Sequence, residues 1–142
     1  MDIQKIIGLV TETQGLIKNR EMAAHVKEKG LADYVTQVDI AVQDFLKKEL
    51  FALAPDIQFL GEETGLQEIK ADSFWILDPV DGTTNLMHDY QHSVVSLALC
   101  CQGEIIMGII YDPFRDEVFS AIKGKGSFLN GQPIHVSNAE KL

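Results

Sequence analysis

Residues 75–85 read WILDPVDGTTN, an apolar run that leads into a turn rich in hydrogen-bonding side chains. The apolar run predicts a strand that ends at Asp78, because Pro79 has no N–H with which to continue sheet pairing. Residues 81–82 then redirect the backbone, and residues 83–85 are of the kinds that open helices. A strand end followed by a helix start gathers backbone N–H groups at one spot, which favours an anion such as phosphate.

Two carboxylates, Asp78 and Asp81, lie in this same turn. Carboxylates repel phosphate, so cations are needed between the like charges. Ligands that are all oxygen suit Mg²⁺ best. The turn therefore predicts a magnesium and phosphate site. The alternative is that each acid faces water separately, which the position of Asp78 at the end of an apolar strand disfavours.

A second acidic pair, Glu62 and Glu63, follows a predicted strand over residues 57–60. If this strand lies beside the one that ends at Asp78, the carboxylates of Glu62 and Asp78 meet at one edge of a sheet. Two carboxylates about 5 Å apart repel by roughly 3 kcal/mol at an effective dielectric constant of about 20. Cations or protons offset such repulsion. For Glu63, separate exposure to water is the better interpretation.

The chain before these strands predicts two helices. Apolar residues recur at three- and four-residue steps and indicate one helix from about Ile3 to Val26, with Gly30 as its C-cap. Thr36 is followed three residues later by Asp39, which resembles a capping box although the box usually has Glu or Gln. The second helix starts there and ends before Pro55.

The second half of the chain is rich in β-structure. Asn130-Gly131 is the strongest hairpin signal, and Gln102-Gly103 is another. The expected strands cover residues 57–60, 75–78, 93–101, 104–111, 117–121, 127–129 and 133–136. Two N-terminal helices packed on a mostly antiparallel sheet make an α+β fold.

Composition limits the classes of function. The chain has 142 residues, enough for one domain, and a formal charge of −9, which argues against nucleic-acid or membrane-surface binding. It has no apolar run long enough to span a bilayer and no recognisable signal peptide, so a cytoplasmic protein is expected. Adjacent Cys100 and Cys101 are expected to be unbridged thiols.

Other polar residues are weaker candidates. His88 and His92 have a spacing that metal ligands use, but no further His or Cys cluster supports zinc, so exposed loop histidines are favoured. Lys29, Lys123 and Lys125 are possible phosphate contacts. Solvated loop lysines are the simpler interpretation, above all for the last two.

Three motifs, taken together, resemble those of the inositol monophosphatase family of magnesium-dependent, lithium-sensitive phosphatases. They are DYVTQVD at 33–39, GEET at 61–64 and, the most specific, DPVDGTTN at 78–85. The resemblance covers essentially the whole chain. It implies the N-terminal half, as a metal- and phosphate-binding domain over residues 1–142, of a layered α/β/α/β/α sugar-phosphatase fold.

The resemblance also implies a metal site. The carboxylates of Glu62 and Asp78 and the backbone carbonyl of Val80 would hold one Mg²⁺, and Asp78 with Asp81 would hold another. Two or three ions are expected, for which Mn²⁺ or Ca²⁺ can substitute. By the same resemblance Lys29 matches a lysine of a mobile loop.

The substrate would be a phosphate monoester such as inositol 1-phosphate, attacked in line by a metal-activated water. By resemblance, Gly82 and Thr83 would contact the phosphate through backbone N–H groups, and Thr83 with Asp39 would orient and deprotonate the water. The implied catalytic set is Glu62, Thr83 and Asp39. The implied substrate-binding set is Glu62, Val80, Asp81, Gly82 and Thr83.

One departure from the family pattern matters. Family members are about twice this long, and their C-terminal α/β domain supplies a further metal-binding aspartate. We therefore expect this chain alone to hydrolyse substrate poorly, and to expose an apolar surface where the other half would pack. A homodimer is also expected.

Several alternatives stay open at this point. Fructose-bisphosphatase, bisphosphate-nucleotidase or NADP-phosphatase activity is compatible with the same motifs. A non-catalytic dimerisation or partner-binding module with an incomplete metal site is a different class. An acidic cation buffer lacks support because no EF-hand spacing occurs.

Overall fold

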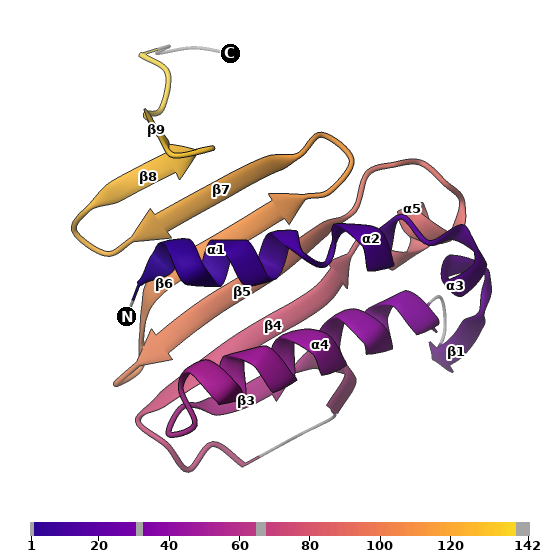
Figure 1. The fold of residues 1–142 in the computed structure, drawn as a ribbon, viewed down its shortest axis with the longest axis horizontal. Coiled ribbons are helices and arrows are strands. Elements are labelled where there is room, and N and C mark those ends of the chain that lie inside the picture. The colour runs from indigo at the N-terminus through magenta and orange to yellow at the C-terminus, as the bar shows by residue number, and fades with distance from the viewer. Residues whose placement is uncertain (1, 31–32, 65–67, 139–142) are drawn as a thin grey trace.

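A seven-stranded sheet forms the centre of the protein, and helices cover one of its faces (Figure 1). The computed structural model describes residues 2–30, 33–64 and 68–138. The strands lie in the order in which they occur along the chain, and every neighbouring pair is antiparallel except β3 and β4. They are β3 (Gln58–Gly61), β4 (Ser73–Asp81), β5 (Val94–Cys101), β6 (Glu104–Asp112), β7 (Glu117–Ile122), β8 (Gly126–Leu129) and β9 (Gln132–Ile134). The predicted α+β fold is confirmed.

Both predicted hairpin turns are present. Gln102 and Gly103 between β5 and β6, and Asn130 and Gly131 between β8 and β9, all have positive φ. Such turns match the right-handed twist of the strands that they join, which is why these dipeptides are reliable signals. The last strand is shorter than predicted, because β9 ends at Ile134.

The predicted single N-terminal helix is wrong. It is divided into α1 (Ile3–Thr11), α2 (Gln14–Ile17) and α3 (Arg20–Ala24). Buried Thr13 donates its hydroxyl to the carbonyl of Val10 at 2.6 Å, and the side chain of Asn19 caps α3. Side chains that bond to nearby backbone in this way compete with a continuous helix.

The predicted C-cap at Gly30 is also wrong, because the chain there is a strand. β1 (Val26–Gly30) pairs antiparallel with β2 (Asp33–Thr36) in a separate two-stranded sheet. The pairing depends on a neighbouring strand, so the polar sequence of β1 alone gave no local sign of it.

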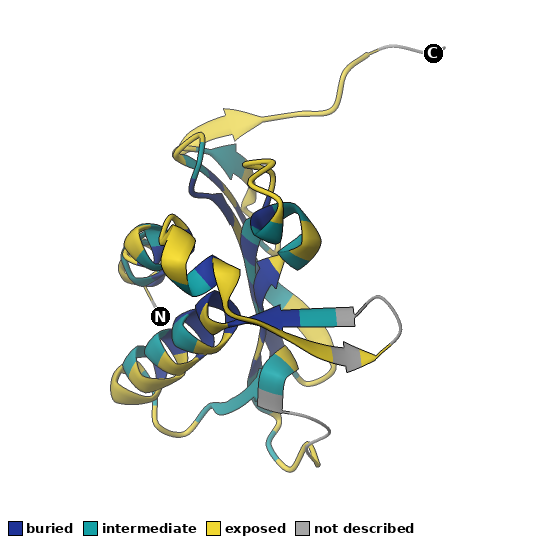
Figure 2. Cartoon of the chain, turned by 90° about the vertical axis from the view of Figure 1, so that its right-hand side faces the viewer, coloured by how far each residue is buried: buried dark blue, intermediate teal, exposed yellow. Residues whose placement is uncertain are grey.

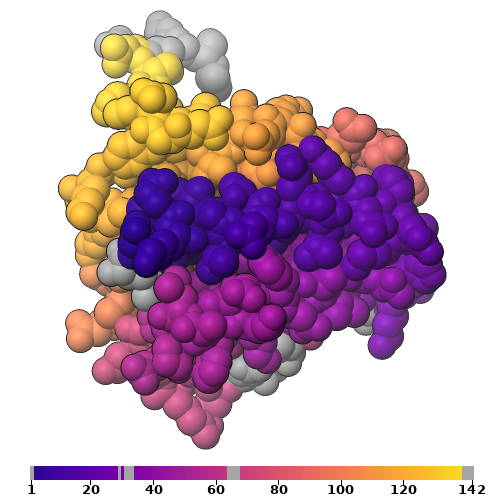
Figure 3. Space-filling model, in the orientation of Figure 1, coloured from indigo at the N-terminus to yellow at the C-terminus, as the bar shows by residue number. Residues whose placement is uncertain are grey.

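α4 (Gln37–Leu53) begins at the predicted capping box, and both of its hydrogen bonds, between Thr36 and Asp39, are present. Its buried face packs on β4, while α1 contacts β6 (Figure 1). Figure 3 shows this helical face, with α1 to α3 above α4. Two short elements complete the fold, the 3₁₀ helix η1 (Glu62–Thr64) and α5 (Thr83–Met87). No helix in the described ranges is long and apolar enough to cross a membrane.

The core lies between the helices and one face of the sheet. Trp75 and Tyr111 are each 1% exposed and belong to it. Among the described residues, the long helices α1 and α4 lie on one side of the sheet, and no long helix covers the other side (Figure 2). Ile76, Ile110 and Phe119 are 39%, 45% and 38% exposed. Part of the exposed apolar surface of the described residues therefore lies on this open face.

The strand that carries Asp78 does not end there, as had been predicted. β4 continues to Asp81 and shifts its register against β5 between these residues, so Asp78 pairs with Ser96 and Asp81 with Val94. Pro79 falls inside this irregularity. A bulge is one of the few places where a strand tolerates a proline.

Candidate active site

The ends of β3 and β4 and the start of α5 surround a polar cavity of about 290 Å³. Its lining contains all the residues that the sequence predicted to bind metal or substrate. Tyr34, Thr84 and Asn85 line it as well. The complete lining is Tyr34, Glu62, Asp78, Val80, Asp81, Gly82, Thr83, Thr84 and Asn85.

The two leading carboxylates come together because of strand pairing. β3 and β4 are parallel neighbours, and Gly61 lies opposite Leu77. The next residues along the chain, Glu62 at the start of η1 and Asp78 within β4, therefore follow at the same end of this strand pair. The condition on which the two carboxylates were expected to meet, that the strands leading to them are neighbours, holds in this fold.

The surroundings raise the pKa of Asp78 to about 7. Burial contributes most to this rise, followed by the negative charge of Glu62, a hydrogen bond with Glu62 and the charge of Asp81. The backbone N–H of Val80, which donates to Asp78 Oδ1 at 3.2 Å, acts in the opposite direction. A site that disfavours ionisation in this way gains from a proton or a cation.

The oxygen-rich lining fits a hard cation such as Mg²⁺. Within the described ranges, however, no three His, Cys, Asp or Glu side chains are grouped closely enough to enclose an ion. A cation held mainly by Glu62 and Asp78 would need its remaining ligands from backbone carbonyls, water or substrate. Mg²⁺ commonly keeps several waters, so such a partial set of protein ligands is compatible with it.

Asp39 lies behind the cavity and is 2% exposed. Its Oδ2 accepts bonds from the backbone N–H of Thr36 at 2.8 Å and from the hydroxyl of Thr36 at 2.5 Å. Its Oδ1 lies 2.9 Å from the hydroxyl oxygen of Thr83, which also has the carbonyl of Val80 within 3.0 Å. The single hydroxyl proton of Thr83 is therefore directed toward Asp39 or the carbonyl of Val80. The hydroxyl oxygen of Thr83 can then accept a hydrogen bond from a molecule in the cavity.

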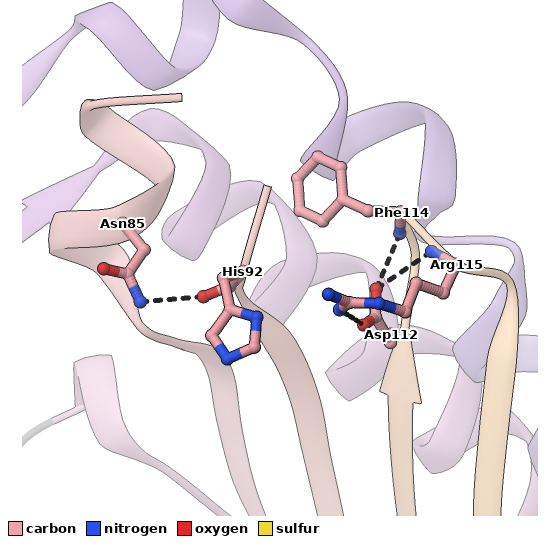
Figure 4. A network of polar contacts seen from close by, with 5 residues as sticks. All are labelled: Asn85, His92, Asp112, Phe114 and Arg115. Atoms are coloured by element: carbon pink, nitrogen blue, oxygen red, sulfur yellow. Dashed lines mark hydrogen bonds and ion pairs between the residues drawn. The ribbon is translucent and has the colours of Figure 1, made fainter. Parts of the chain in front are cut away.

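The turn at Gly82 requires glycine. Its φ is +97°, and a Cβ there would lie 3.0 Å from the carbonyl oxygen of His92. Ser93 donates its hydroxyl to the carbonyl of Gly82 at 2.8 Å. Asn85 donates its side-chain N–H to the carbonyl of His92 at 2.8 Å, as Figure 4 shows. These bonds tie the start of α5 to the segment that enters β5.

Sequence reasoning missed Gln43, which supports the other side of the cavity. Gln43 is 4% exposed, and its Oε1 accepts the backbone N–H of Glu63 at 3.0 Å. A Cβ on Gly61 would overlap this Oε1 and lie 2.6 Å from the Cδ of Gln43. The available signal was its position, four residues after Asp39 on the same face of α4.

Ser93 was also missed as a supporting residue. Ser93 is 2% exposed. It is the first residue of the strand predicted over residues 93–101, and that prediction used only the apolar pattern of the segment. A buried hydroxyl needs a partner, but the sequence does not say which carbonyl supplies it.

The weaker candidates remain outside the cavity. His88 and His92 are exposed, as expected, and the ring of His88 stacks on Tyr90 with centroids 5.8 Å apart. Lys123 forms a surface ion pair with Glu104. The side chain of Lys29 lies outside the described residues. Cys100 and Cys101 are free thiols, as predicted.

A neighbouring carboxylate, Asp112, is held by its own loop. It accepts bonds from the backbone N–H groups of Phe114 and Arg115 and pairs with the guanidinium of Arg115 at 2.6 Å (Figure 4). Burial raises the pKa of Asp112, but the bonds from Arg115 and Phe114 outweigh it, and the net pKa is lowered. These contacts indicate that Asp112 stabilises the loop that contains Phe114 and Arg115.

Acidic side chains beside an anion-binding turn, with a Thr–Asp pair behind it, indicate a phosphatase. The model described as "Inositol monophosphatase family" matches residues 2–142, and the chain belongs to this family.

Individual relatives agree with this assignment. Inositol monophosphatase 3 of Solanum lycopersicum is 43% identical over 122 residues, which are 83% of this chain and 46% of that protein. The extragenic suppressor protein SuhB of Bartonella henselae has a TM-score of 0.90 at 34% identity, over 99% of this chain and 56% of that one. An IMPase/NADP phosphatase solved with Mg²⁺ and phosphate has a TM-score of 0.87 at 29% identity, over 99% of this chain and 55% of that one. The chain spans about half the length of the curated relatives it matches.

Proposed function

We propose that this chain is the phosphate- and metal-binding half of a Mg²⁺-dependent phosphate monoester hydrolase, with inositol 1-phosphate or a related polyol phosphate as substrate. One observation carries the proposal: Glu62 and Asp78 meet beside the Gly82 turn, in surroundings that raise the pKa of Asp78 to about 7. The names of the relatives support the reaction class, and the Mg²⁺ and phosphate of one similar structure support the ligands.

In this proposal Glu62 and Asp78, with the carbonyl of Val80, would hold one cation, and Asp78 with Asp81 would hold a second one. When bound, Mg²⁺ would neutralise phosphate charge and increase the acidity of water. The backbone at Gly82 and Thr83 binds the phosphate oxygens, because the start of α5 directs N–H groups toward an anion.

The Thr83–Asp39 pair orients the attacking water. Asp39 is fixed by Thr36 and accepts the hydroxyl of Thr83 at 2.9 Å. The oxygen of Thr83 then accepts a hydrogen bond from water and aligns it with the phosphorus. As that water loses a proton, the proton passes to Thr83 while the hydroxyl proton of Thr83 passes to Asp39.

We propose further that residues 1–142 form a metal- and phosphate-binding domain that corresponds to the N-terminal half of the family fold. Since the chain spans about half of its relatives, its own rate of hydrolysis is expected to be low. The cytoplasmic location, the homodimer, lithium sensitivity and the number of ions stay predictions.

Calorimetric titration of the chain with Mg²⁺, followed by inorganic phosphate, tests the binding part. The wild type should bind Mg²⁺, and phosphate should bind only when Mg²⁺ is present. Asp78→Asn should weaken Mg²⁺ binding at least about tenfold, because it removes a directly coordinating charge. Asp56→Asn, at an exposed position after α4, is the matched control. Equal Mg²⁺ affinity in the wild type and Asp78→Asn would remove the basis of the proposal.

A panel of phosphate esters tests the substrate class. Phosphate release should be detectable from inositol 1-phosphate in the presence of Mg²⁺. Faster release from fructose 1,6-bisphosphate, a 3′,5′-bisphosphonucleotide or NADP would favour one of the related activities instead.

The open face of the sheet favours a second candidate function, a module that binds a partner or a second copy. Exposed Ile110 and Phe119 lie on paired positions of β6 and β7 and form part of an apolar surface. Binding of a partner with no Mg²⁺ binding at all would favour this function over hydrolysis.

A further inference from the structure

A second cavity lies away from the acid-lined one, between the end of α4 and strands β3 and β4. It has a volume of about 670 Å³, compared with about 290 Å³ for the acid-lined cavity. The two cavities share no lining residue. The volume is within the range of sites for small organic ligands.

Three aromatic side chains form part of the wall of this cavity. Trp75 is 1% exposed, and Phe59 is half-buried. Phe51, near the end of α4, is 63% exposed. An exposed ring beside two packed aromatic residues leaves an apolar surface that a flat or branched apolar group can cover.

The indole of Trp75 has an unsatisfied hydrogen-bond donor. Its Nε1 is buried, and it has no hydrogen-bond partner among the described residues. A buried indole N–H usually has a partner, and none of the described residues supplies one here.

The rim adds positive charge. Lys47 and Lys48 both line the cavity, while Asp44 contributes one negative charge. Lys48 pairs with Glu49 at 3.5 Å. No ion pair of Lys47 occurs among the described side chains, so Lys47 is free to pair with an anionic group.

From these features we propose that the pocket formed by Lys47, Phe51, Phe59 and Trp75 binds a small amphiphilic anion. The apolar or aromatic body of the ligand packs against the rings, and its carboxylate or sulfonate pairs with Lys47. This binding does not depend on the phosphatase site.

Two dyes that differ only in a charged group provide the test. Anilinonaphthalene sulfonate and uncharged N-phenyl-1-naphthylamine have the same apolar body. Each is titrated into the full chain, and binding is followed by dye emission and by quenching of Trp75, the single tryptophan of the sequence. The wild type should bind the sulfonate about fivefold more tightly than the uncharged dye.

Variants separate this pocket from other apolar surfaces. Lys47→Glu should abolish the preference for the sulfonate, and Phe51→Ser should weaken both dyes about tenfold. Both side chains are exposed, so folding is expected to be preserved and is checked by circular dichroism. Lys5→Glu on α1 and Phe119→Ser on the open sheet face are the controls, and neither should change the affinities.

Three outcomes would overturn the proposal. The first is the absence of saturable quenching of Trp75. The second is unchanged affinity for both dyes in Lys47→Glu and Phe51→Ser. The third is loss of binding in Phe119→Ser, which would assign the dyes to the open sheet face. Asp78→Asn should bind both dyes as the wild type does, so this test is separate from that of the proposed function.

Discussion

Replacement of Asp78 by asparagine should make the protein more stable at neutral and alkaline pH in the absence of divalent cations. Asp78 has its pKa raised from 3.8 to about 7, mainly by burial and then by Glu62 and Asp81. Asparagine has nearly the same shape, carries no charge and can still accept the N–H of Val80, which lies 3.2 Å from Asp78 Oδ1. The change therefore removes the repulsion and keeps the local geometry.

The size of the effect follows from linkage. The folded protein binds the proton of Asp78 more tightly than the unfolded chain does. The stability that this supplies is complete below the unfolded pKa of 3.8 and is lost as the pH rises through about 7. About three pKa units correspond to about 4 kcal/mol. Asp78 is only half-buried, so solvent screening reduces this to about 2 kcal/mol.

Urea unfolding at about pH 5 and about pH 8, with a chelator present, measures this effect. From about pH 5 to about pH 8 the free energy of unfolding of the wild type should fall by about 1–2 kcal/mol more than that of Asp78→Asn. The variant should be the more stable of the two at the higher pH. Mg²⁺ at about ten times its Kd should then stabilise wild type by about 1.4 kcal/mol and the variant much less. Identical pH dependence in the two proteins, or equal stabilisation by Mg²⁺, would refute the reasoning.

Three further predictions concern the supports of the site and the open sheet face. Asp39→Asn should cost about 1–2 kcal/mol in urea unfolding, because it weakens the capping box; no loss would contradict the role assigned to it. Gly61→Ala should cost about 1–3 kcal/mol in the wild type and clearly less beside Gln43→Ala, as a double-mutant cycle would show. Lysine at both Ile110 and Phe119 should reduce self-association in sedimentation velocity, unless the wild type is monomeric at high concentration.

Local chemistry made much of this structure predictable. The Asn130-Gly131 turn, the cap at Thr36 and the glycine at position 82 each need a particular residue for a reason that acts within a few positions. The stretch at 75–85 contains three local signals in succession, which are an apolar run, a turn at residues 81–82 and the helix-opening residues 83–85. Its strand, turn and short helix were therefore foreseen, apart from the continuation of β4 through Pro79.

Long-range partners set the limits of prediction. The strand β1 exists because β2 pairs with it, and the break after Thr11 depends on buried Thr13. Gln43 supports the cavity through a backbone N–H that is twenty residues away in the chain. Such contacts follow from the assembled fold, and periodicity of a single segment does not contain them.

The carboxylate of Asp39 joins a structural event to a chemical one. The same side chain closes the first turn of α4 and restrains the hydroxyl of Thr83. Fraying of that first turn would leave the hydroxyl of Thr83 with the carbonyl of Val80 as its remaining acceptor. If this turn frays on warming, the hydrogen bond between Asp39 and Thr83 should be lost while the sheet is still intact.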